Sequence, residues 1–253
     1  MSGVFISMNN EKLSINLLFP VLNERLRLER GIENCMAYLR ANVDNPYILT
    51  ILDNGSDDET PDIAKALVAK YPEVNYVRIE ERGVGIAFKT GIEGNDCDIV
   101  GYMDIDLSTD LKYLSKTIQL FTDDEKLDYV NGSRFSKDSD TKGRKWYRKI
   151  TSAGLVFLLK MIFKMQATDA VCGFTFLRKN SAEKLVEKCS DDHGWFYTIE
   201  FLLRAERMGM KIYDMPVEWT EDYDTTVKVW KTIKNYLVRI KALRKAFKEE
   251  GIL

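Results

Sequence analysis

Residues 99–106 read Ile-Val-Gly-Tyr-Met-Asp-Ile-Asp, an apolar run that leads directly into two carboxylates. A buried strand that ends in this way delivers Asp104 and Asp106 to the edge of a sheet, where α/β proteins bind ligands. Two carboxylates at such an edge suit a hard divalent cation, Mg²⁺ or Mn²⁺, and such cations commonly bridge phosphates. The stretch therefore predicts an α/β fold with a metal site at the end of a strand.

The Asp-x-Asp spacing carries little information by itself. The chain contains four such triplets, at residues 96–98, 104–106, 138–140 and 222–224. Only the triplet at 104–106 follows a strand-like run, so the context of this pair, and not its spacing, predicts the metal site.

Strand-like and helix-like segments alternate through the first 110 residues. Strands are expected at residues 15–19, 48–52, 75–79 and 98–103, and helices at 22–38, at 60–70 and after the glycine loop at 83–91. Thr60 is the expected N-cap of the second helix, with Pro61 at its first position. This alternation predicts a mostly parallel sheet. The strand ends would gather Asn23, Glu24, Asp53 and the Asp104–Asp106 pair at one edge.

The second half of the chain is less regular. We expect a strand at 129–132, a basic loop at 136–149, a helix at 150–164, a turn at 169–173, a helix at 194–208, a short strand at 211–215 and a C-terminal helix from about residue 225.

Composition excludes several classes of protein. With 253 residues, 45% hydrophobic and 30% charged, the chain is typical of a soluble globular protein. Its net charge of −2 gives no general attraction to nucleic acid, so no nucleic-acid partner is expected. Four dispersed cysteines and one histidine predict neither a zinc site nor a disulfide framework. The apolar run at 153–163 is too short to span a bilayer, and residues 1–12 do not read as a signal peptide. A cytoplasmic location follows, and a homo-oligomer is left open.

Eight motifs in order resemble one family. Residues 19–24 (Phe-Pro-Val-Leu-Asn-Glu), 53–60 (Asp-Asn-Gly-Ser-Asp-Asp-Glu-Thr), 82–85 (Arg-Gly-Val-Gly) and 102–109 resemble motifs of the family 2 inverting glycosyltransferases of the GT-A fold. Residues 132–135, 169–174, 194–200 and 216–219 narrow the resemblance to dolichyl- or polyprenyl-phosphate hexose synthases. The resemblance implies a GT-A (Rossmann-like) domain at 1–225, with a mostly parallel central sheet flanked by helices, and a basic amphipathic helix at 226–253.

The resemblance also implies roles in binding a nucleoside diphosphate sugar. Asp53 would hold the base, Pro20 and Glu24 would line the nucleotide pocket, and Asp104 and Asp106 would bind the cation on the diphosphate. Two basic residues match less well. Lys89 stands where many relatives carry arginine and is either a phosphate contact or a surface lysine, and Lys228 stands where relatives carry a basic residue near the donor phosphates.

For the acceptor, Arg134, Arg148 and Ser152 resemble the family's phosphate clamp, since a guanidinium fork binds phosphate through two hydrogen bonds. Glu200 and Asp169 are candidates to position the acceptor or, for an alcohol, to act as its base. Thr198 replaces a carboxylate that relatives often carry. A phosphate monoester is already ionised near neutral pH, so this loss suits a lipid-phosphate acceptor better than a hydroxyl.

The C-terminal segment predicts a basic amphipathic helix with three alternative partners. Its apolar residues recur every three or four positions between Val227 and Phe247, among eight lysines and arginines. Such a helix binds a membrane surface, a second subunit or its own domain.

The favoured function is metal-dependent inverting transfer of a hexose from a UDP- or GDP-sugar to a polyprenyl phosphate, by a peripheral protein at the cytoplasmic membrane face. One alternative acceptor is a sugar hydroxyl of a cell-surface glycan. The other alternative is a catalytically silent protein that binds a nucleotide sugar.

Overall fold

The computed structural model describes residues 12–191, 193–221 and 229–253. A seven-stranded sheet has the order β3-β2-β1-β4-β7-β5-β8. The strand β7 runs antiparallel to both of its neighbours, and all other pairs are parallel. Its strands are β1 (Ile15–Val21), β2 (Tyr47–Asp53), β3 (Val74–Arg78), β4 (Ile99–Met103), β5 (Tyr129–Ser133), β7 (Phe174–Arg178) and β8 (Ile212–Pro216). A small parallel sheet pairs β6 (Asp140–Lys142) with β9 (Glu218–Thr220).

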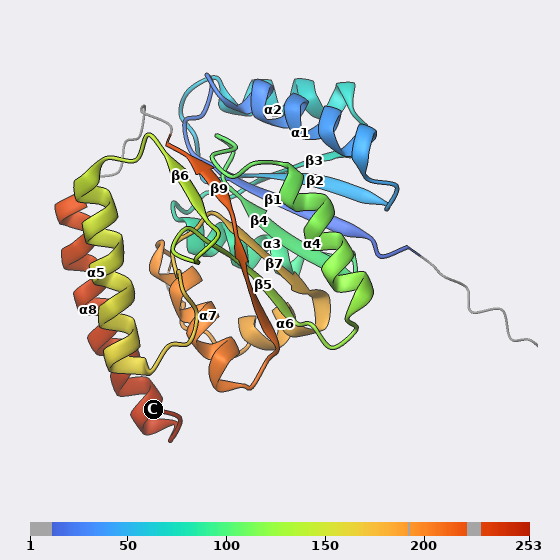
Figure 1. The fold of residues 1–253 in the computed structure, drawn as a ribbon. Helices are drawn as coiled ribbons and strands as arrows, with labels where there is room; N and C mark the ends of the chain where they lie inside the picture. The colour runs from blue at the N-terminus through green and yellow to red at the C-terminus, as the bar shows by residue number, and fades with distance from the viewer. Residues whose placement is uncertain (1–11, 192, 222–228) are drawn as a thin grey trace, which may run out of the picture.

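Helices cover both faces of the large sheet (Figure 1). The helices α1, α2 and α4 pack on one face, and α3, α6 and α7 pack on the other. In chain order the helices are α1 (Leu28–Asn42), α2 (Thr60–Lys70), α3 (Val84–Glu93), α4 (Lys112–Asp123), α5 (Trp146–Phe163), α6 (Lys179–Val186), α7 (Phe196–Arg207) and α8 (Val229–Glu249). The predicted fold class, a mostly parallel sheet flanked by helices, is confirmed.

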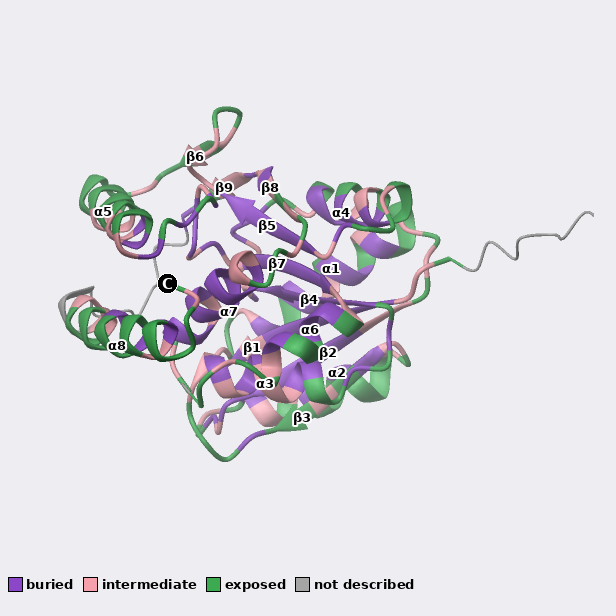
Figure 2. Ribbon diagram, turned by 90° about the horizontal axis from the view of Figure 1, so that it is seen from below, coloured by how far each residue is buried: buried purple, intermediate pink, exposed green. Residues whose placement is uncertain are grey.

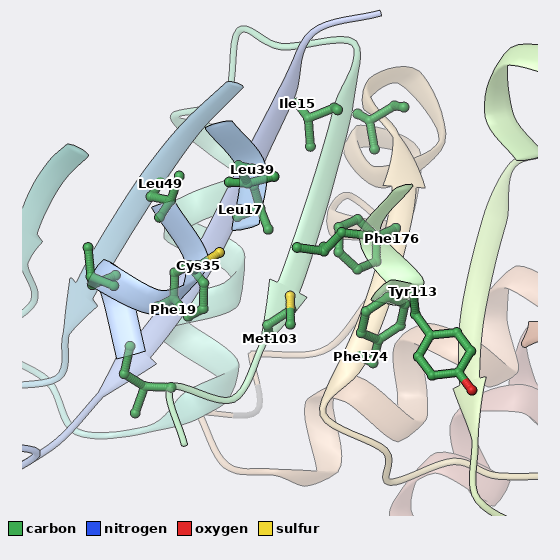
Figure 3. Close-up of a cluster of buried hydrophobic side chains, with 14 of the residues drawn as sticks. Ile15, Leu17, Phe19, Cys35, Leu39, Leu49, Met103, Tyr113, Phe174 and Phe176 are labelled. Carbon is green, nitrogen blue, oxygen red and sulfur yellow. The ribbon is translucent and has the colours of Figure 1, made fainter. Parts of the chain in front are cut away.

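The side chains of β1 point alternately to the two faces of the large sheet, and both faces are covered. Leu17 and Phe19 point into the core beneath α1, whereas Leu18 points into the core on the α3 side. Figure 3 shows the first core, where Ile15, Leu17 and Phe19 lie near Cys35 and Leu39 of α1. A strand buried on both faces reads as a continuous apolar run, which is the pattern that predicted it.

Parallel strands place their carboxyl ends at one edge of the sheet. The ends of β1, β2, β4, β5 and β8 therefore share an edge, and because β7 is antiparallel, the turn that precedes it at 169–173 lies at the same edge. This edge collects all the acidic and basic strand ends that the sequence singled out, and we call it the site edge.

Several element boundaries differ from the prediction. The helix expected from residue 22 begins at Leu28, because residues 22–27 form a turn in which Asn23 has φ 57° and the Glu24 carbonyl accepts from two N–H groups. β1 continues through Pro20, which is tolerated because β4 pairs only as far as Leu18 and leaves one side of the strand without a ladder. Thr60 does not cap α2, since its Oγ1 accepts from the Glu24 N–H at 2.8 Å.

Several helices and strands were not predicted from the sequence. β7, β9, α4 and α6 were not expected, and the expected loop at 136–149 contains β6 and the first turn of α5. β6 and β9 are three residues each, too short for a periodic pattern to identify them.

The helices α5 and α8 form one side of the molecule (Figures 1 and 2). They meet where the rings of Phe163 and Phe247 contact edge to face, with centroids 5.5 Å apart. Ile240, Leu243 and Phe247 of α8 are buried in the same core as α7, so this part of the predicted amphipathic helix packs on its own domain. None of the helices in the described part of the chain has the length and apolar character needed to cross a bilayer.

Candidate active site

Asp53 ends β2 at the site edge and is completely buried. Its Oδ2 accepts from the Tyr76 hydroxyl at 2.7 Å and from Arg78 Nη1 at 2.9 Å, and its Oδ1 accepts from the Ser56 N–H at 2.8 Å. Arg78 also donates to the Ser56 carbonyl. These contacts fix the carboxylate and place a guanidinium beside it, and the role of Asp53 toward a base stays a prediction.

The turn after β1 lies beside Asp53. Pro20 is half-buried in β1 and is paired in register with Leu52. The Glu24 side chain forms an ion pair with Arg27 at 3.0 Å, and its main-chain N–H is held by Thr60. The turns that follow β1 and β2 are thus joined, as a nucleotide pocket formed by both would require.

Asp104 is the first residue after β4 and is half-buried, with its carboxylate close against Gly173. Oδ1 accepts from the Tyr102 hydroxyl at 2.8 Å. A Cβ atom at Gly173 would lie 1.8 Å from Oδ2, so only glycine fits at that position. Burial raises the pKa of Asp104 to about 6, and the charge of Asp106 is the second largest cause of the rise.

The two carboxylates are suited to a metal ion that is shared with a phosphate ligand. Asp106 Oδ1 accepts from the Ser108 N–H at 2.9 Å. The hydroxyls of Ser108 and Thr109 are buried without a hydrogen-bond partner in the described structure. Within the described ranges no three His, Cys, Asp or Glu residues cluster to hold a metal by themselves. Mg²⁺ is usually held by one or two carboxylates, with water and substrate phosphates completing its shell, and Asp104 and Asp106 fit that pattern.

Arg134 and Asp169 form a buried ion pair across the site edge. Arg134 Nε donates to Asp169 Oδ2 at 2.8 Å, and Nη2 donates to Oδ1 at 3.1 Å and to the Val171 carbonyl at 2.9 Å. The Arg134 and Asp169 side chains are only 7% and 0% exposed. Burial opposes ionisation of Asp169, but the charge and hydrogen bonds of Arg134 outweigh it and lower its pKa. Asp169 is therefore a weak base, and its contacts make it the residue that positions Arg134.

The other two residues predicted for the acceptor phosphate, Arg148 and Ser152, lie on α5. Arg148 Nη1 forms an ion pair with Glu221 at 2.9 Å, and the Ser152 hydroxyl accepts from Arg144 Nη2 at 2.7 Å. The guanidinium carbons of Arg134 and Arg144 lie 5.4 and 5.6 Å from the ring centroid of Trp219. Trp219 therefore joins Arg134 to the first turns of α5.

Glu200 makes no hydrogen bond or ion pair with Arg134, Arg148 or Ser152 in the described structure. Glu200 is buried in α7, where its Oε1 accepts from the Ser190 N–H and from Arg204 Nε, and its Oε2 accepts from the Ser190 hydroxyl. Arg204 in turn pairs with Glu250 after α8. These contacts connect α7 to the C-terminus of the chain, and a role for Glu200 toward the acceptor stays a prediction.

Two further basic residues were predicted to contact the donor. Lys89 lies on α3 and pairs with Asp191 at 2.9 Å. Lys228 lies outside the described residues.

Sequence reasoning missed Tyr76, Arg78, Tyr102, Arg144 and Glu221. Arg78 stands opposite Asp53 in the β2–β3 register, so it becomes visible once the two strand ends are aligned. Tyr102 was expected in a strand, but its hydroxyl was given no role. Glu221 follows a three-residue strand that the sequence did not predict, and no local signal identified it.

Comparison with known proteins finds sequence relatives that are glycosyltransferases. AglD of Haloferax volcanii is 28% identical over 226 residues, which is 87% of this chain but 35% of that protein, so this chain spans about a third of that relative. Dolichyl-phosphate beta-glucosyltransferase ALG5A of Trichomonas vaginalis is 27% identical over 228 residues, covering 87% of this chain and 70% of that one. The dolichyl-phosphate beta-glucosyltransferase of Dictyostelium discoideum is 26% identical over 226 residues, covering 83% and 68%.

Among solved structures, glucosyl-3-phosphoglycerate synthase of Mycobacterium tuberculosis in complex with UDP matches with a TM-score of 0.69 and 18% identity. The match covers 92% of this chain and 80% of that chain. The same enzyme with Mn²⁺, UDP and glucosyl-3-phosphoglycerate matches with a TM-score of 0.67 and 17% identity, covering 92% of this chain and 80% of that chain. At this level of identity the likeness shows the fold.

The sheet order and the likeness to these solved structures show the GT-A fold. The chain belongs to glycosyl transferase family 2, whose match covers residues 17–186, more than half of its length. The resemblance predicted from the sequence motifs is thereby confirmed.

Proposed function

We propose that the protein transfers a hexose from a nucleoside diphosphate sugar, of the UDP-glucose or GDP-mannose type, to a polyprenyl phosphate, with inversion at the sugar. The observation that carries the proposal is the shared site edge. There the buried Asp53, the Asp104–Asp106 pair and the Arg134–Asp169 pair come from the ends of β2, β4 and β5 and from the turn before β7. A base-binding group, a metal-binding pair and a phosphate-binding group are the three parts that such a transfer requires.

On this proposal the residues divide the work between donor and acceptor. Asp53 and Arg78 bind the base, and Glu24 and Pro20 line the pocket. Asp104 and Asp106 hold Mg²⁺ or Mn²⁺, whose charge stabilises the departing diphosphate. Arg134, together with Arg148 and Ser152, holds the acceptor phosphate from the other side. Catalysis then rests mainly on positioning and charge stabilisation in a single in-line displacement.

The two candidate bases favour a phosphate acceptor over a hydroxyl. Arg134 lowers the pKa of Asp169 and so makes it a weak base, and Glu200 is bound by Ser190 and Arg204 in α7. Thr198, which replaces the family carboxylate, donates its hydroxyl to the Trp195 carbonyl at 3.0 Å. An alcohol acceptor needs a base, whereas a phosphate monoester is already largely ionised at neutral pH. The names of the dolichyl-phosphate glucosyltransferase relatives support the same choice.

The test is a transfer assay with radiolabelled UDP-glucose or GDP-mannose, Mn²⁺ and undecaprenyl phosphate, followed by solvent extraction. We expect label to enter the organic phase only when lipid phosphate and metal are both present. Label that instead stays in the aqueous phase on an oligosaccharide would support the glycan acceptor. Binding of UDP and Mn²⁺ without turnover of any donor would support the catalytically silent protein.

We also propose that α5 and α8 bind a membrane surface. Trp146, Ile150, Phe157 and Met161 of α5 are 61–74% exposed, and Leu237 and Val238 of α8 are also exposed. Figure 2 shows exposed residues along both helices. Exposed basic residues accompany them: Lys145, Lys149, Lys160 and Lys164 on or beside α5, and Lys234, Lys241, Arg244 and Lys248 on α8. Exposed apolar and basic side chains on one side of a protein suit an anionic lipid surface.

Replacing Phe157 and Met161 together by serine is expected to lower binding to anionic vesicles about tenfold or more, since each side chain would lose buried apolar area. Co-sedimentation with phosphatidylglycerol–phosphatidylcholine vesicles measures the change. Val68→Ser on α2, which also removes an exposed apolar side chain, should bind as the unaltered protein does. Equal binding by the double variant would reject α5 as a membrane-binding element.

A further inference from the structure

Three arginines gather where β5, α5 and β9 meet, and their charges are not balanced. Asp169 neutralises Arg134, and Glu221 neutralises Arg148. Arg144 makes no ion pair with any described residue, and Ser152 is its only hydrogen-bond partner there. We call Arg134, Arg144 and Arg148 the arginine cluster. Together with its two carboxylates it carries one net positive charge, which belongs to Arg144.

Arg144 is held in place by aromatic rings. Its guanidinium carbon lies 5.6 Å from the ring centroids of both Trp219 and Phe135, and Arg134 contacts the same two rings. Burial, and next the charge of Arg134, lower the pKa of Arg144 to about 10, so it stays charged at neutral pH. A stacked arginine loses little freedom when it binds an anion, which makes it a good phosphate ligand.

The Arg148–Glu221 pair is incompletely satisfied, in contrast to Arg134–Asp169. The Glu221 side chain is 1% exposed, yet neither of its oxygens makes a hydrogen bond within the described structure, and Arg148 Nε is buried without a partner. A buried ion pair gains enough to offset desolvation only when hydrogen bonds satisfy its remaining lone pairs and protons. Arg148 therefore has bonding capacity that Glu221 does not use.

The charge of a phosphate monoester indicates which ligand uses the free bonding capacity of Arg148. A phosphate monoester carries about −1.5 to −2 charges at neutral pH. Arg144 alone supplies one positive charge, and Arg148 supplies a second only when Glu221 releases it. Glu221 acts on Arg144 as well, because its charge is among those that raise the pKa of that arginine.

Resting on the proposed function, we propose that the Glu221 carboxylate and the acceptor phosphate compete for Arg148, and that Arg144 is the permanently available arginine that binds the phosphate first. Glu221 then acts as an internal anion that sets the affinity of the acceptor site. Weak anions do not displace it, whereas a doubly charged phosphate held also by Arg144 does.

Calorimetric titration of the full chain with geranyl phosphate tests the competition directly. Removing a competing charged partner should strengthen phosphate binding by about tenfold or more in Glu221→Gln. Glu221→Asp, which keeps the charge but shortens its reach, should move the affinity in the same direction and covers the case in which the glutamine variant is unstable. Arg144→Gln should weaken binding about tenfold or more, and the gain from Glu221→Gln should vanish when Arg148 is also replaced by glutamine.

Glu218→Gln is the matched control. Glu218 lies on the same short segment, and its side chain is engaged by Lys112 outside the arginine cluster, so the same chemical change there should leave phosphate affinity unaltered. Geraniol, which lacks phosphate, should not distinguish the variants. Titrated with inorganic phosphate, the variants should rank in the same order of affinity if the phosphate group is recognised by itself. They should not differ from one another if the lipid chain is required.

Weaker or unchanged binding of geranyl phosphate in both Glu221 variants would overturn the competition and make Glu221 a positioning residue for Arg148. The competition is equally overturned if neither the unaltered protein nor any variant binds geranyl phosphate. Failure of the proposed function is a separate result: phosphate binding would be strengthened in Glu221→Gln, while no donor sugar would be transferred to polyprenyl phosphate.

Discussion

Replacing Asp106 by alanine is expected to lower sugar transfer by at least about a thousandfold, or about 4 kcal/mol in the barrier. On the proposed function, negative charge develops on the departing diphosphate, and a cation held by Asp106 and Asp104 would stabilise it. Asp106 is only partly buried, and its one internal hydrogen bond in the described structure comes from the Ser108 N–H. The change should therefore affect the reaction far more than the fold.

Initial rates with saturating donor, together with the melting temperature of each protein, measure this effect. Asp138→Ala is the matched control, because it removes an exposed carboxylate from a second Asp-x-Asp triplet away from the end of β4. Transfer by the Asp106 variant at the rate of the unaltered protein would reject both the metal site and the proposed mechanism.

Replacing Asp169 by asparagine should lower the free energy of unfolding by about 3–5 kcal/mol. Asparagine has nearly the same shape, but it leaves the buried Arg134 guanidinium without its counter-charge. Arg134 would also lose the orientation that its two hydrogen bonds to Asp169 impose. We therefore expect transfer activity to fall as well, through weaker binding of the acceptor.

The stabilisation that the Asp169–Arg134 ion pair gives the fold depends on pH, and the pKa of Asp169 sets the direction of this dependence. The pKa of Asp169 is lower in the folded protein than its ordinary value, so its ion pair stabilises the fold above the unfolded value of about 4. That contribution is lost as the pH falls through the folded pKa. Urea unfolding should show that the unaltered protein and Asp169→Asn differ in free energy of unfolding by a constant amount from neutral pH to about pH 4. Below pH 4 that difference should shrink.

Asp62→Asn provides the control for this experiment. Asp62 forms an exposed ion pair with Lys65 on α2, and such pairs contribute roughly 0–1 kcal/mol. A difference for Asp169→Asn that is no larger than this control would mean that the buried pair does not stabilise the fold.

The first half of the fold was predictable because its pattern is strong. Long apolar runs separated by turn residues locate β1, β2 and β4, and parallel topology follows from the helices between them. β7 was missed although its five residues are nearly all buried, because a short apolar run reads equally well as part of a helix. The start of α1 was misplaced because Leu22 and Leu26, four residues apart, continue the helical pattern through a turn.

The site was predictable where residues follow strands and unpredictable where they meet across them. Asp53, Asp104 and Arg134 each lie at or just after the end of a strand, so chain position alone brings them to one edge. The pairing of Arg148 with Glu221 instead joins segments more than seventy residues apart, and only tertiary structure fixes such a partner. For the same reason the sequence offered Asp169 as a base, whereas burial beside Arg134 makes it a weak one.

The reversed direction of β7 determines where the chain tolerates added segments. The backbone enters this strand beside Asp104, whose N–H donates to the Gly173 carbonyl, and leaves it at the opposite edge, where the Lys179 N–H donates to the Asp98 carbonyl. A tag or reporter domain inserted at 164–173 would lie over the substrates, although the same loop position before a parallel strand would be harmless. Insertion at the exposed turn of Glu125 and Lys126, which precedes the parallel strand β5, keeps the cargo on the far side of the sheet, and that turn is the better choice for labelling.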